Sequence, residues 1–279
     1  MIVAPGVFSP IVAQLARRAG FSCIYFSGAA YSNLQGLPDL GVTTLSEVSE
    51  AVSKITTLVD LPLIVDCDTG FGEAVNVMRT VREMERAGAA AIHIEDQVMP
   101  KRCGHLSGKE LVPVEEMLKK VVSAKDAITK DLVLIARTDA RAVEGLDASI
   151  DRARAYLKAG ADMIFPEALE SQEEFEEFAE KVRAPLLANM TEFGKTPYMP
   201  VSQFEKMGYR VVIFPVTALR AALKTVSDTL RELKRRGTQK EILSRMMTRQ
   251  EVYKAIDYYR YEGADKRALR RYRKLLDTN

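Results

Sequence analysis

The sequence predicts an α/β fold, a parallel (β/α)₈ barrel of the TIM type followed by additional C-terminal helices. Eight short apolar runs alternate with longer amphipathic segments, and glycines follow several of these segments where a helix would end. No apolar run leads into the Gly-x-Gly-x-x-Gly turn of a dinucleotide-binding sheet. Eight strand–helix repeats within about 220 residues favour a closed barrel over a doubly wound sheet.

The eight apolar runs are expected to be strands that are buried on both faces. They are rich in Ile, Val, Leu or Phe and lack the alternation that is typical of a half-exposed strand. In chain order they are residues 2–7, 23–28, 63–68, 91–96, 132–136, 163–167, 186–190 and 211–215.

Amphipathic helices are expected between these strands. Clear examples are residues 47–58, 75–87, 115–128, 148–159 and 173–182. Four glycines precede a predicted strand and tolerate the left-handed conformation that ends a helix, namely Gly20, Gly88, Gly160 and Gly208.

Beyond the eighth strand the pattern is helical only, and it ends in a basic tail that we interpret as a solvated helix face. The helical stretches are residues 219–235, 240–247 and 249–261. We therefore expect a catalytic barrel domain at residues 1–218. Residues 219–279 are expected to form the eighth barrel helix and a C-terminal helical extension that contacts another subunit.

The composition excludes several classes of protein. The 40 Lys and Arg residues against 38 Asp and Glu give a net charge of +2, which leaves no basic excess for nucleic acid. Three cysteines are too few for a disulfide framework. No apolar run approaches the about 20 residues that span a membrane, and the N-terminus lacks a signal-peptide pattern. We expect a cytoplasmic protein that binds neither nucleic acid nor membranes.

Polar residues gather where six of the eight predicted strands end. In a barrel, the carboxyl ends of the strands and the loops after them carry the catalytic groups. One polar terminus would mean little, whereas six predict an active site. The segments are residues 25–29, 66–70, 93–96, 137–139, 166–167 and 189–192.

A metal site is expected at the ends of the third and fourth strands. Asp66 and Asp68 are two residues apart, so they should point to the same side of the strand, and Glu95 can approach from the next strand. An all-oxygen cluster of this kind suits Mg²⁺ or Mn²⁺ better than Zn²⁺. The alternative is that the two aspartates cap a helix or pair with basic residues. Cys67, between them, is expected to be a buried structural residue.

The loop after the fourth strand contains Cys103 between cationic residues, a glycine and His105. Such surroundings favour a thiolate and a reactive thiol, although a solvent loop with an incidental cysteine remains the alternative. Arg137, Arg220 and Arg249 could bind substrate carboxylates in a bidentate manner. Neither of the last two strands precedes a glycine-rich loop, so we expect a polycarboxylate substrate without phosphate.

Several motifs resemble the isocitrate lyase and phosphoenolpyruvate mutase superfamily, and most of all its methylisocitrate lyase family. The signature is Lys101-Arg102-Cys103-Gly104-His105, preceded by His93-Ile94-Glu95-Asp96-Gln97. Supporting stretches include Ser27-Gly28-Ala29, Asp66-Cys67-Asp68-Thr69-Gly70, Ala136-Arg137-Thr138-Asp139-Ala140 and Asn189-Met190-Thr191-Glu192-Phe193-Gly194. The resemblance extends from near residue 2 to about residue 262.

The resemblance implies a Mg²⁺-dependent carbon–carbon lyase that cleaves 2-methylisocitrate to pyruvate and succinate, as in the methylcitrate cycle of propionate catabolism. It implies a homotetramer that exchanges its C-terminal helices. Asp66, Asp68 and Glu95 would hold Mg²⁺, with Mn²⁺ as the other option. Cys103 would be the general acid and Tyr25 the base, with His105 and Lys101 beside them. The implied substrate-binding residues are Ser27, Gly28, Ala29, Asp39, Cys103, Gly104, Arg137, Glu167, Asn189, Met190, Thr191, Arg220 and Arg249.

Other substrates stay open within the same superfamily: isocitrate, a dimethylmalate, oxaloacetate or a phosphonate. The signature loop continues Leu106-Ser107-Gly108-Lys109, which is closer to the isocitrate lyase pattern. The remaining alternative is a barrel without catalysis that acts as a binding module. Such a module would have little need of the acidic cluster together with Cys103.

Overall fold

The computed structural model describes residues 1–276, and eight parallel strands form its centre. The first six strands pair in chain order, the seventh pairs with the eighth, and the eighth pairs with the first. A parallel bridge between Ile164 and Leu186 joins the two remaining edges, so the ring closes and the predicted barrel is confirmed. The strands are β1 (Ile2–Val7), β2 (Ile24–Phe26), β3 (Leu63–Asp66), β4 (Ala91–Glu95), β5 (Val133–Thr138), β6 (Met163–Pro166), β7 (Leu187–Asn189) and β8 (Val211–Phe214).

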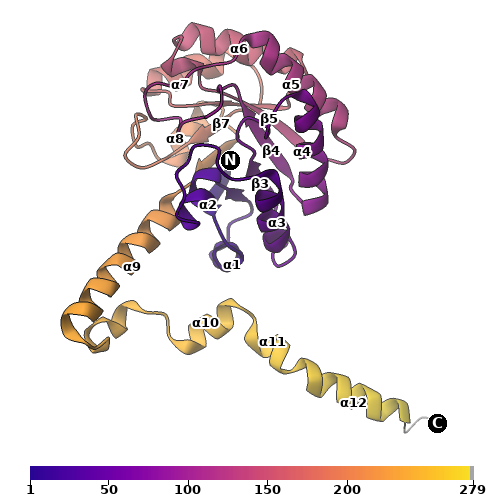
Figure 1. Cartoon of the computed structure of the whole chain (residues 1–279), viewed down its shortest axis with the longest axis vertical. Helices are drawn as coiled ribbons and strands as arrows, with labels where there is room; N and C mark the ends of the chain where they lie inside the picture. Colours follow the sequence, from indigo (N-terminus) through magenta and orange to yellow (C-terminus); the bar gives the residue numbers. More distant parts are fainter. Residues whose placement is uncertain (277–279) are drawn as a thin grey trace. The chain divides into compact units, whose positions relative to one another are not determined.

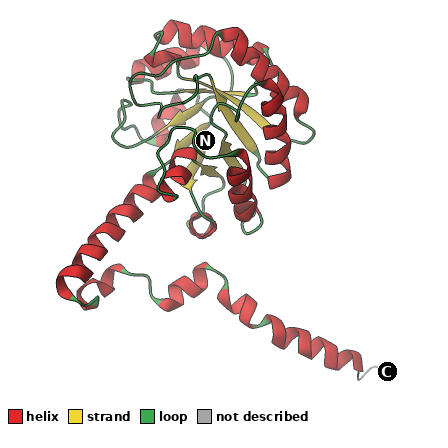
Figure 2. Ribbon diagram, in the orientation of Figure 1, coloured by secondary structure: helices red, strands yellow, loops and turns green. Residues whose placement is uncertain are grey.

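Helices cover the outside of the barrel, as Figures 1 and 2 show. They are α1 (Pro10–Arg18), α2 (Gly28–Leu34), α3 (Leu45–Thr56), α4 (Ala74–Ala87), α5 (Val114–Ala127), α6 (Leu146–Lys158), α7 (Gln172–Lys181) and α8 (Val201–Lys206), with a 3₁₀ turn at Ala140–Ala142. A capping box starts α3, because Thr44 and Glu47 each accept a hydrogen bond from the other's backbone amide. Gly88, with φ +86°, ends α4 in the left-handed conformation that the sequence predicts.

Two apolar layers enclose the strands. Ile24 and Phe26 of β2 face the helices, whereas Tyr25 between them faces the inside of the barrel. The inner layer also contains Phe165, which is fully buried. Cys67 packs in the layer between strands and helices, as expected for a structural cysteine. The barrel is therefore packed throughout, which leaves its carboxyl-terminal mouth for a site.

The chain divides into two compact units, residues 1–221 and the residues from 222 onward. The prediction placed this boundary after residue 218. The second unit contains most of α9 (Thr217–Arg236), a 3₁₀ helix (Lys240–Arg245), α10 (Arg249–Ala255), α11 (Tyr258–Glu262) and α12 (Ala264–Leu276). Within residues 1–276, no helix combines the length and the apolar character that crossing a membrane requires.

An apolar stripe runs along α9 within the second unit. Leu223, Val226, Leu230 and Leu233 are exposed and recur at intervals of three or four residues. Single exposed apolar residues need no explanation, whereas a stripe at helical spacing is typical of a contact surface.

Candidate active site

The acidic cluster lies at the carboxyl ends of β3 and β4, where Asp66, Asp68 and Glu95 are all buried. The backbone amide of Gly28, at the start of α2, donates to Asp66 Oδ2 at 3.0 Å. A Cβ on Gly28 would lie 3.0 Å from that oxygen and 3.4 Å from Asp68 Oδ1. Both carboxylates therefore converge on backbone that has no room for a side chain.

The position of the Asp68 side chain does not follow from the alternation of side chains along a strand. β3 ends at Asp66, and Asp68 has a φ of +47°, in the left-handed region. The expectation that the two aspartates point to one side as members of a continuous strand is therefore wrong, although both carboxylates reach the mouth. A strained residue of this kind is often found where a side chain must be aimed at a site.

Lys101 places its ammonium inside the acidic cluster. Its Nζ lies 2.8 Å from Asp68 Oδ1 and also contacts Asp39. Burial alone would lower the pKa of Lys101, yet the surrounding carboxylates, Asp68 first among them, raise it well above its usual value. Burial raises the pKa of Asp68 to about 6 even though Lys101 opposes that shift. The pair shows how strongly this part of the mouth favours a cation.

The donor set at the mouth fits Mg²⁺. Among the described residues, no three His, Cys, Asp or Glu side chains are already drawn together around one point. Glu95, however, is buried, and neither of its carboxylate oxygens accepts a hydrogen bond from the described residues. Arg137 Nε lies 3.1 Å from Glu95 Oε2, but that nitrogen donates to Asp139. A buried carboxylate without donors is costly unless a cation or water meets it. Three carboxylates and no soft ligand are the chemistry that Mg²⁺ and Mn²⁺ prefer.

Tyr25 and His93 form a pair inside the barrel, below the acidic cluster. Tyr25 Oη lies 2.8 Å from His93 Nε2, and the two rings are nearly parallel. Burial raises the pKa of Tyr25 well above 10 and lowers the pKa of His93 to about 4, so both are neutral at pH 7. Burial therefore opposes the phenolate that a base would require.

The loop with Cys103 follows β4 and turns back at the mouth, with Leu106 N donating to Cys103 O at 2.9 Å. The expected thiolate is not supported, because burial raises the pKa of Cys103. The neighbouring cations point elsewhere: Lys101 reaches Asp68, and Arg102 donates to the carbonyl of Ser107. Cys103 is thus a protonated thiol, which suits an acid better than a nucleophile.

His105 fixes the turn from its far side. Its Nε2 lies 3.0 Å from Glu167 Oε1, and its Nδ1 accepts from Lys195 N at 3.1 Å. Because Nδ1 is an acceptor, Nε2 carries the proton that faces Glu167. Gly104 packs directly on Glu167, since a Cβ there would lie 2.3 Å from Glu167 Cγ.

Glu167 and Asn189 meet on the β6–β7 side of the mouth. Asn189 Nδ2 lies 3.3 Å from both carboxylate oxygens of Glu167, and Asn189 Oδ1 accepts no hydrogen bond from the described residues. In spite of its burial, the charge of Arg137, the hydrogen bond from His105 and the charge of Lys109 hold the pKa of Glu167 well below its usual range. Glu167 is therefore a permanent anion that orients donors around it.

Arg137 is engaged with protein carboxylates. Its Nε and Nη2 donate to Asp139 at 2.9 and 3.1 Å, and Nε is 3.1 Å from Glu95 Oε2. The guanidinium lies over the ring of Phe165 at 5.2 Å. Only Nη1, at 3.8 Å from Glu167, is held loosely. A bidentate clamp on substrate, as the sequence suggested, would need Arg137 to leave Asp139.

The other predicted substrate-binding residues lie on α2, in the loop after β7, and on the helices that follow β8. Ser27 caps α2 by accepting from Ala30 N, which places Ala29 in the first turn of that helix. Met190 and Thr191 follow β7. Arg220 contacts Glu192 and stacks over Phe193. Arg249 starts α10 and belongs to the second unit, so the barrel unit alone does not supply it.

Two residues that the sequence reading did not single out are central to the mouth. Lys109 is buried and donates to Asp139 Oδ1 at 2.7 Å, and Asp139 in turn holds Arg137. A second lysine at the end of the cysteine loop was the one available signal. Nothing in the sequence indicates which lysine of a loop becomes buried.

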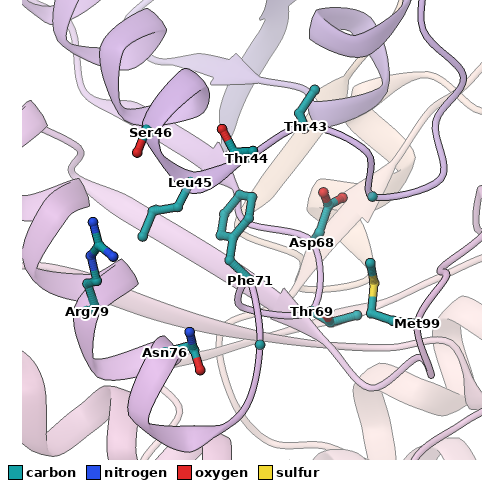
Figure 3. A pocket seen from close by; sticks show the side chains of 12 residues that line it. Thr43, Thr44, Leu45, Ser46, Asp68, Thr69, Phe71, Asn76, Arg79 and Met99 are labelled. Carbon is teal, nitrogen blue, oxygen red and sulfur yellow. The ribbon is translucent and has the colours of Figure 1, made fainter.

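A pocket of about 480 Å³ opens beside Asp68 (Figure 3). In that view Asp68 and Met99 lie at one end, Arg79 lies at the other, and Phe71 is between them. The pocket lies between the start of α3 and the loop after β3, and it gives Asp68 an opening next to the mouth.

Comparisons with known proteins identify the family of the chain. The profile of the phosphoenolpyruvate phosphomutase family matches residues 1–234. The 2-methylisocitrate lyase of Aeropyrum pernix is 58% identical over 276 residues, which cover 99% of this chain and 89% of that protein. The 2-methylisocitrate lyase of Bacillus subtilis is 54% identical over 262 residues, covering 94% and 87%. The crystal structure of a 2,3-dimethylmalate lyase aligns with a TM-score of 0.90 and 37% identity, over 96% of this chain and 90% of that one. The chain therefore belongs to the phosphoenolpyruvate phosphomutase family, within the superfamily that its motifs indicated.

Proposed function

We propose that the chain is a carbon–carbon lyase that cleaves 2-methylisocitrate into pyruvate and succinate. The main support for this substrate is the 58% identity, over 99% of the chain, to the 2-methylisocitrate lyase of Aeropyrum pernix. The chemistry is supported by the buried acidic cluster and the protonated Cys103 thiol at one barrel mouth. A binding module without catalysis is disfavoured, because these buried charges would be costly without a task.

Asp66, Asp68 and Glu95 are proposed to hold Mg²⁺, with Mn²⁺ as a substitute. When bound, such an ion supplies Lewis-acid stabilisation of the negative charge that develops on oxygen as the carbon–carbon bond breaks. Gly28 supports this arrangement because its amide orients Asp66, and its missing side chain lets both aspartates approach.

Cys103 is proposed to act as the general acid. Cleavage removes a proton from the substrate hydroxyl and leaves electron density on the carbon that becomes part of succinate, and the thiol proton is delivered to that carbon. Because burial raises the pKa of Cys103, the thiol keeps its proton through the neutral range until it is needed. His105, fixed by Glu167, holds the turn that aims the thiol.

The base that removes the hydroxyl proton is less well supported. Tyr25 in this role stays a prediction, and its buried contact with His93 favours a neutral hydrogen-bonding role instead. A Tyr25→Phe variant tests this assignment, because a loss of turnover that the pH cannot restore would support the base role. Turnover that persists in the variant would remove Tyr25 from the chemistry.

Polar groups around the mouth are proposed to bind the substrate carboxylates. Ser27 opens α2 beside Asp66, and Lys101 supplies positive charge. Asn189 Oδ1, which accepts no hydrogen bond from the described residues, is an acceptor for a substrate hydroxyl. Thr191 follows β7, and Arg220 in α9 contacts Glu192 of the same loop. The substrate is therefore a small di- or tricarboxylate, and the cytoplasmic location expected from the sequence stays a prediction.

The second unit is proposed to mediate assembly into a homotetramer. The exposed stripe of Leu223, Val226, Leu230 and Leu233 suits a helix that packs on another copy. Light scattering should then give four times the chain mass of 31.1 kDa. A monomeric mass would refute this assembly without affecting the proposed reaction.

A release assay tests the proposed function directly. With Mg²⁺ present, 2-methylisocitrate should yield pyruvate and succinate in equal amounts, whereas isocitrate would yield glyoxylate. A panel that adds 2,3-dimethylmalate and oxaloacetate covers the related reactions. If 2-methylisocitrate releases no pyruvate and another acid of the panel is cleaved, that acid replaces it as the proposed substrate.

A further inference from the structure

Lys109 is a buried cation to which the proposed reaction assigns no task. Its side chain is 1% exposed, and its Nζ donates to Gly104 O at 2.5 Å and to Asp139 Oδ1 at 2.7 Å. An ammonium is strongly hydrated in water, so a lysine is almost never buried unless it is paired. The two acceptors belong to different parts of the mouth, which indicates that Lys109 joins them.

The first acceptor is the backbone of the turn that carries the thiol. Gly104 lies between Cys103 and His105, so a hydrogen bond to its carbonyl fixes the backbone next to the thiol. The base of this excursion is already closed, because Gln97 exchanges two hydrogen bonds of 2.9 Å with the backbone of Arg102, and Gln97 also bridges to Leu111. These contacts leave the tip of the loop, residues 103–106, to be held by other groups.

The second acceptor is the partner of Arg137. Asp139 receives Nε and Nη2 of Arg137, and its backbone amide donates to Asp96 at 2.9 Å. Asp139 is therefore held rigidly at the end of β5. Through Lys109, the same carboxylate fixes both the guanidinium and the thiol turn.

The turn has a second anchor on the opposite side. His105 is held by Glu167, which follows β6, and by the backbone of Lys195 after β7. Two anchors that follow different strands fix a turn against rotation, whereas one leaves it free to swing. Removal of Lys109 would leave His105 as the anchor and would leave Asp139 with one cation fewer.

We propose that Lys109 is a positioning residue that holds the Cys103 turn closed against the barrel mouth and keeps Asp139 and Arg137 in register with it. Its catalytic consequence rests on the proposed function, because it concerns the step in which Cys103 delivers a proton. Its structural consequence, an ordered and shielded thiol turn, does not depend on the substrate.

The test compares Lys109→Met, Lys109→Arg and Lys119→Met in the full-length enzyme. Lys119→Met is the matched control, because that lysine is exposed on α5 and forms its ion pair with Glu116 on the same helix. The readout is the rate at which iodoacetamide alkylates Cys103 at fixed pH, followed by mass spectrometry of the peptide. Lys109→Met should raise this rate about tenfold by opening the turn, whereas the control should match wild type and Lys109→Arg should recover most of the protection.

Steady-state kinetics give the second readout. If a misplaced thiol impairs proton delivery, kcat should fall about 100-fold in Lys109→Met while KM changes less than about threefold. Unchanged alkylation together with unchanged kcat would overturn the proposal. Faster alkylation with an unchanged kcat would overturn the catalytic part of it.

Two further measurements keep the proposal falsifiable. Should Lys109→Met fail to fold, hydrogen exchange on wild type replaces it: residues 101–109 should be protected relative to residues 193–198, and equal exchange would overturn the proposal. If wild type does not cleave 2-methylisocitrate, the proposed function fails, while the alkylation rates still decide the role of Lys109.

Discussion

Gly104→Ala tests whether the thiol turn must lie against Glu167. A Cβ at residue 104 would be 2.3 Å from Glu167 Cγ and 2.5 Å from its Cδ and Oε1, whereas ordinary contact begins at 3.4 Å. Glu167 cannot retreat, because it is buried and held by His105 and Asn189. The turn must therefore move outward by about 1 Å, a displacement that is enough to cost on the order of 100-fold in rate when it separates reacting groups.

Kinetics and stability together decide this test. We expect kcat for pyruvate release to fall about 100-fold, and the free energy of unfolding to fall by about 1–3 kcal/mol because the new methyl overpacks a buried contact. Gly263→Ala is the control, since its Cβ would meet mainly the end of the flexible Arg267 side chain, which can move away. A Gly104→Ala enzyme with a kcat within threefold of wild type would refute the reasoning.

Four further predictions follow from the same site. Asp68→Asn should abolish Mg²⁺-dependent turnover and remove the rise in Tm that Mg²⁺ gives wild type; a variant that keeps both contradicts the metal assignment. Cys103→Ser should lower kcat by at least about 100-fold with little change in KM, because a hydroxyl is a far weaker acid than a thiol. Since burial raises the pKa of Cys103, its thiolate forms only as the pH rises past the usual thiol range, so its alkylation rate should still be climbing at pH 9; a plateau below pH 8 would show the opposite shift. The enzyme should prefer 2-methylisocitrate over isocitrate by about 10- to 200-fold in kcat/KM, the value of one methyl group in an apolar pocket, and equal values would argue for the other substrate.

The barrel could be predicted because its strands are buried on both faces. Continuous apolar runs leave little ambiguity when they recur eight times between amphipathic helices. The ends of the strands were predicted less well. Residues 23–28 read as one strand, yet β2 ends at Phe26 because Ser27 caps α2. A polar residue at a strand end and a helix cap look the same in sequence.

The sequence indicated which charged residues belong to the site, but not which of them pair with one another. Lys101 and Arg102 directly precede Cys103 in sequence, which suggested a thiolate, but their long side chains carry the charge to Asp68 and Ser107. The position of a lysine or arginine along a loop says little about where the charged end of its flexible side chain lies. In the same way, the alternation expected for Asp66 and Asp68 failed because the chain leaves the strand between them with a positive φ.

Lys109 and Asp139 illustrate what sequence alone does not contain. Each is a common residue type in a polar stretch, and both become essential only because the loop folds back onto the end of β5. Burial turns an ordinary charge into one that must be paired, and burial is a property of the tertiary structure.

The charge balance of the mouth explains why an anionic substrate and a cation would belong together here. Five buried carboxylates, Asp66, Asp68, Glu95, Asp139 and Glu167, face three buried cations, Lys101, Lys109 and Arg137. Asp96 has its own cation nearby in Arg152. If all five were ionised, the excess would be two negative charges, and the raised pKa values of Asp68 and Glu95 show that the metal-free protein resists that state. One divalent cation would supply the missing charge. Because an excess of buried anions repels a polycarboxylate, the mouth would accept such a substrate only with that cation bound.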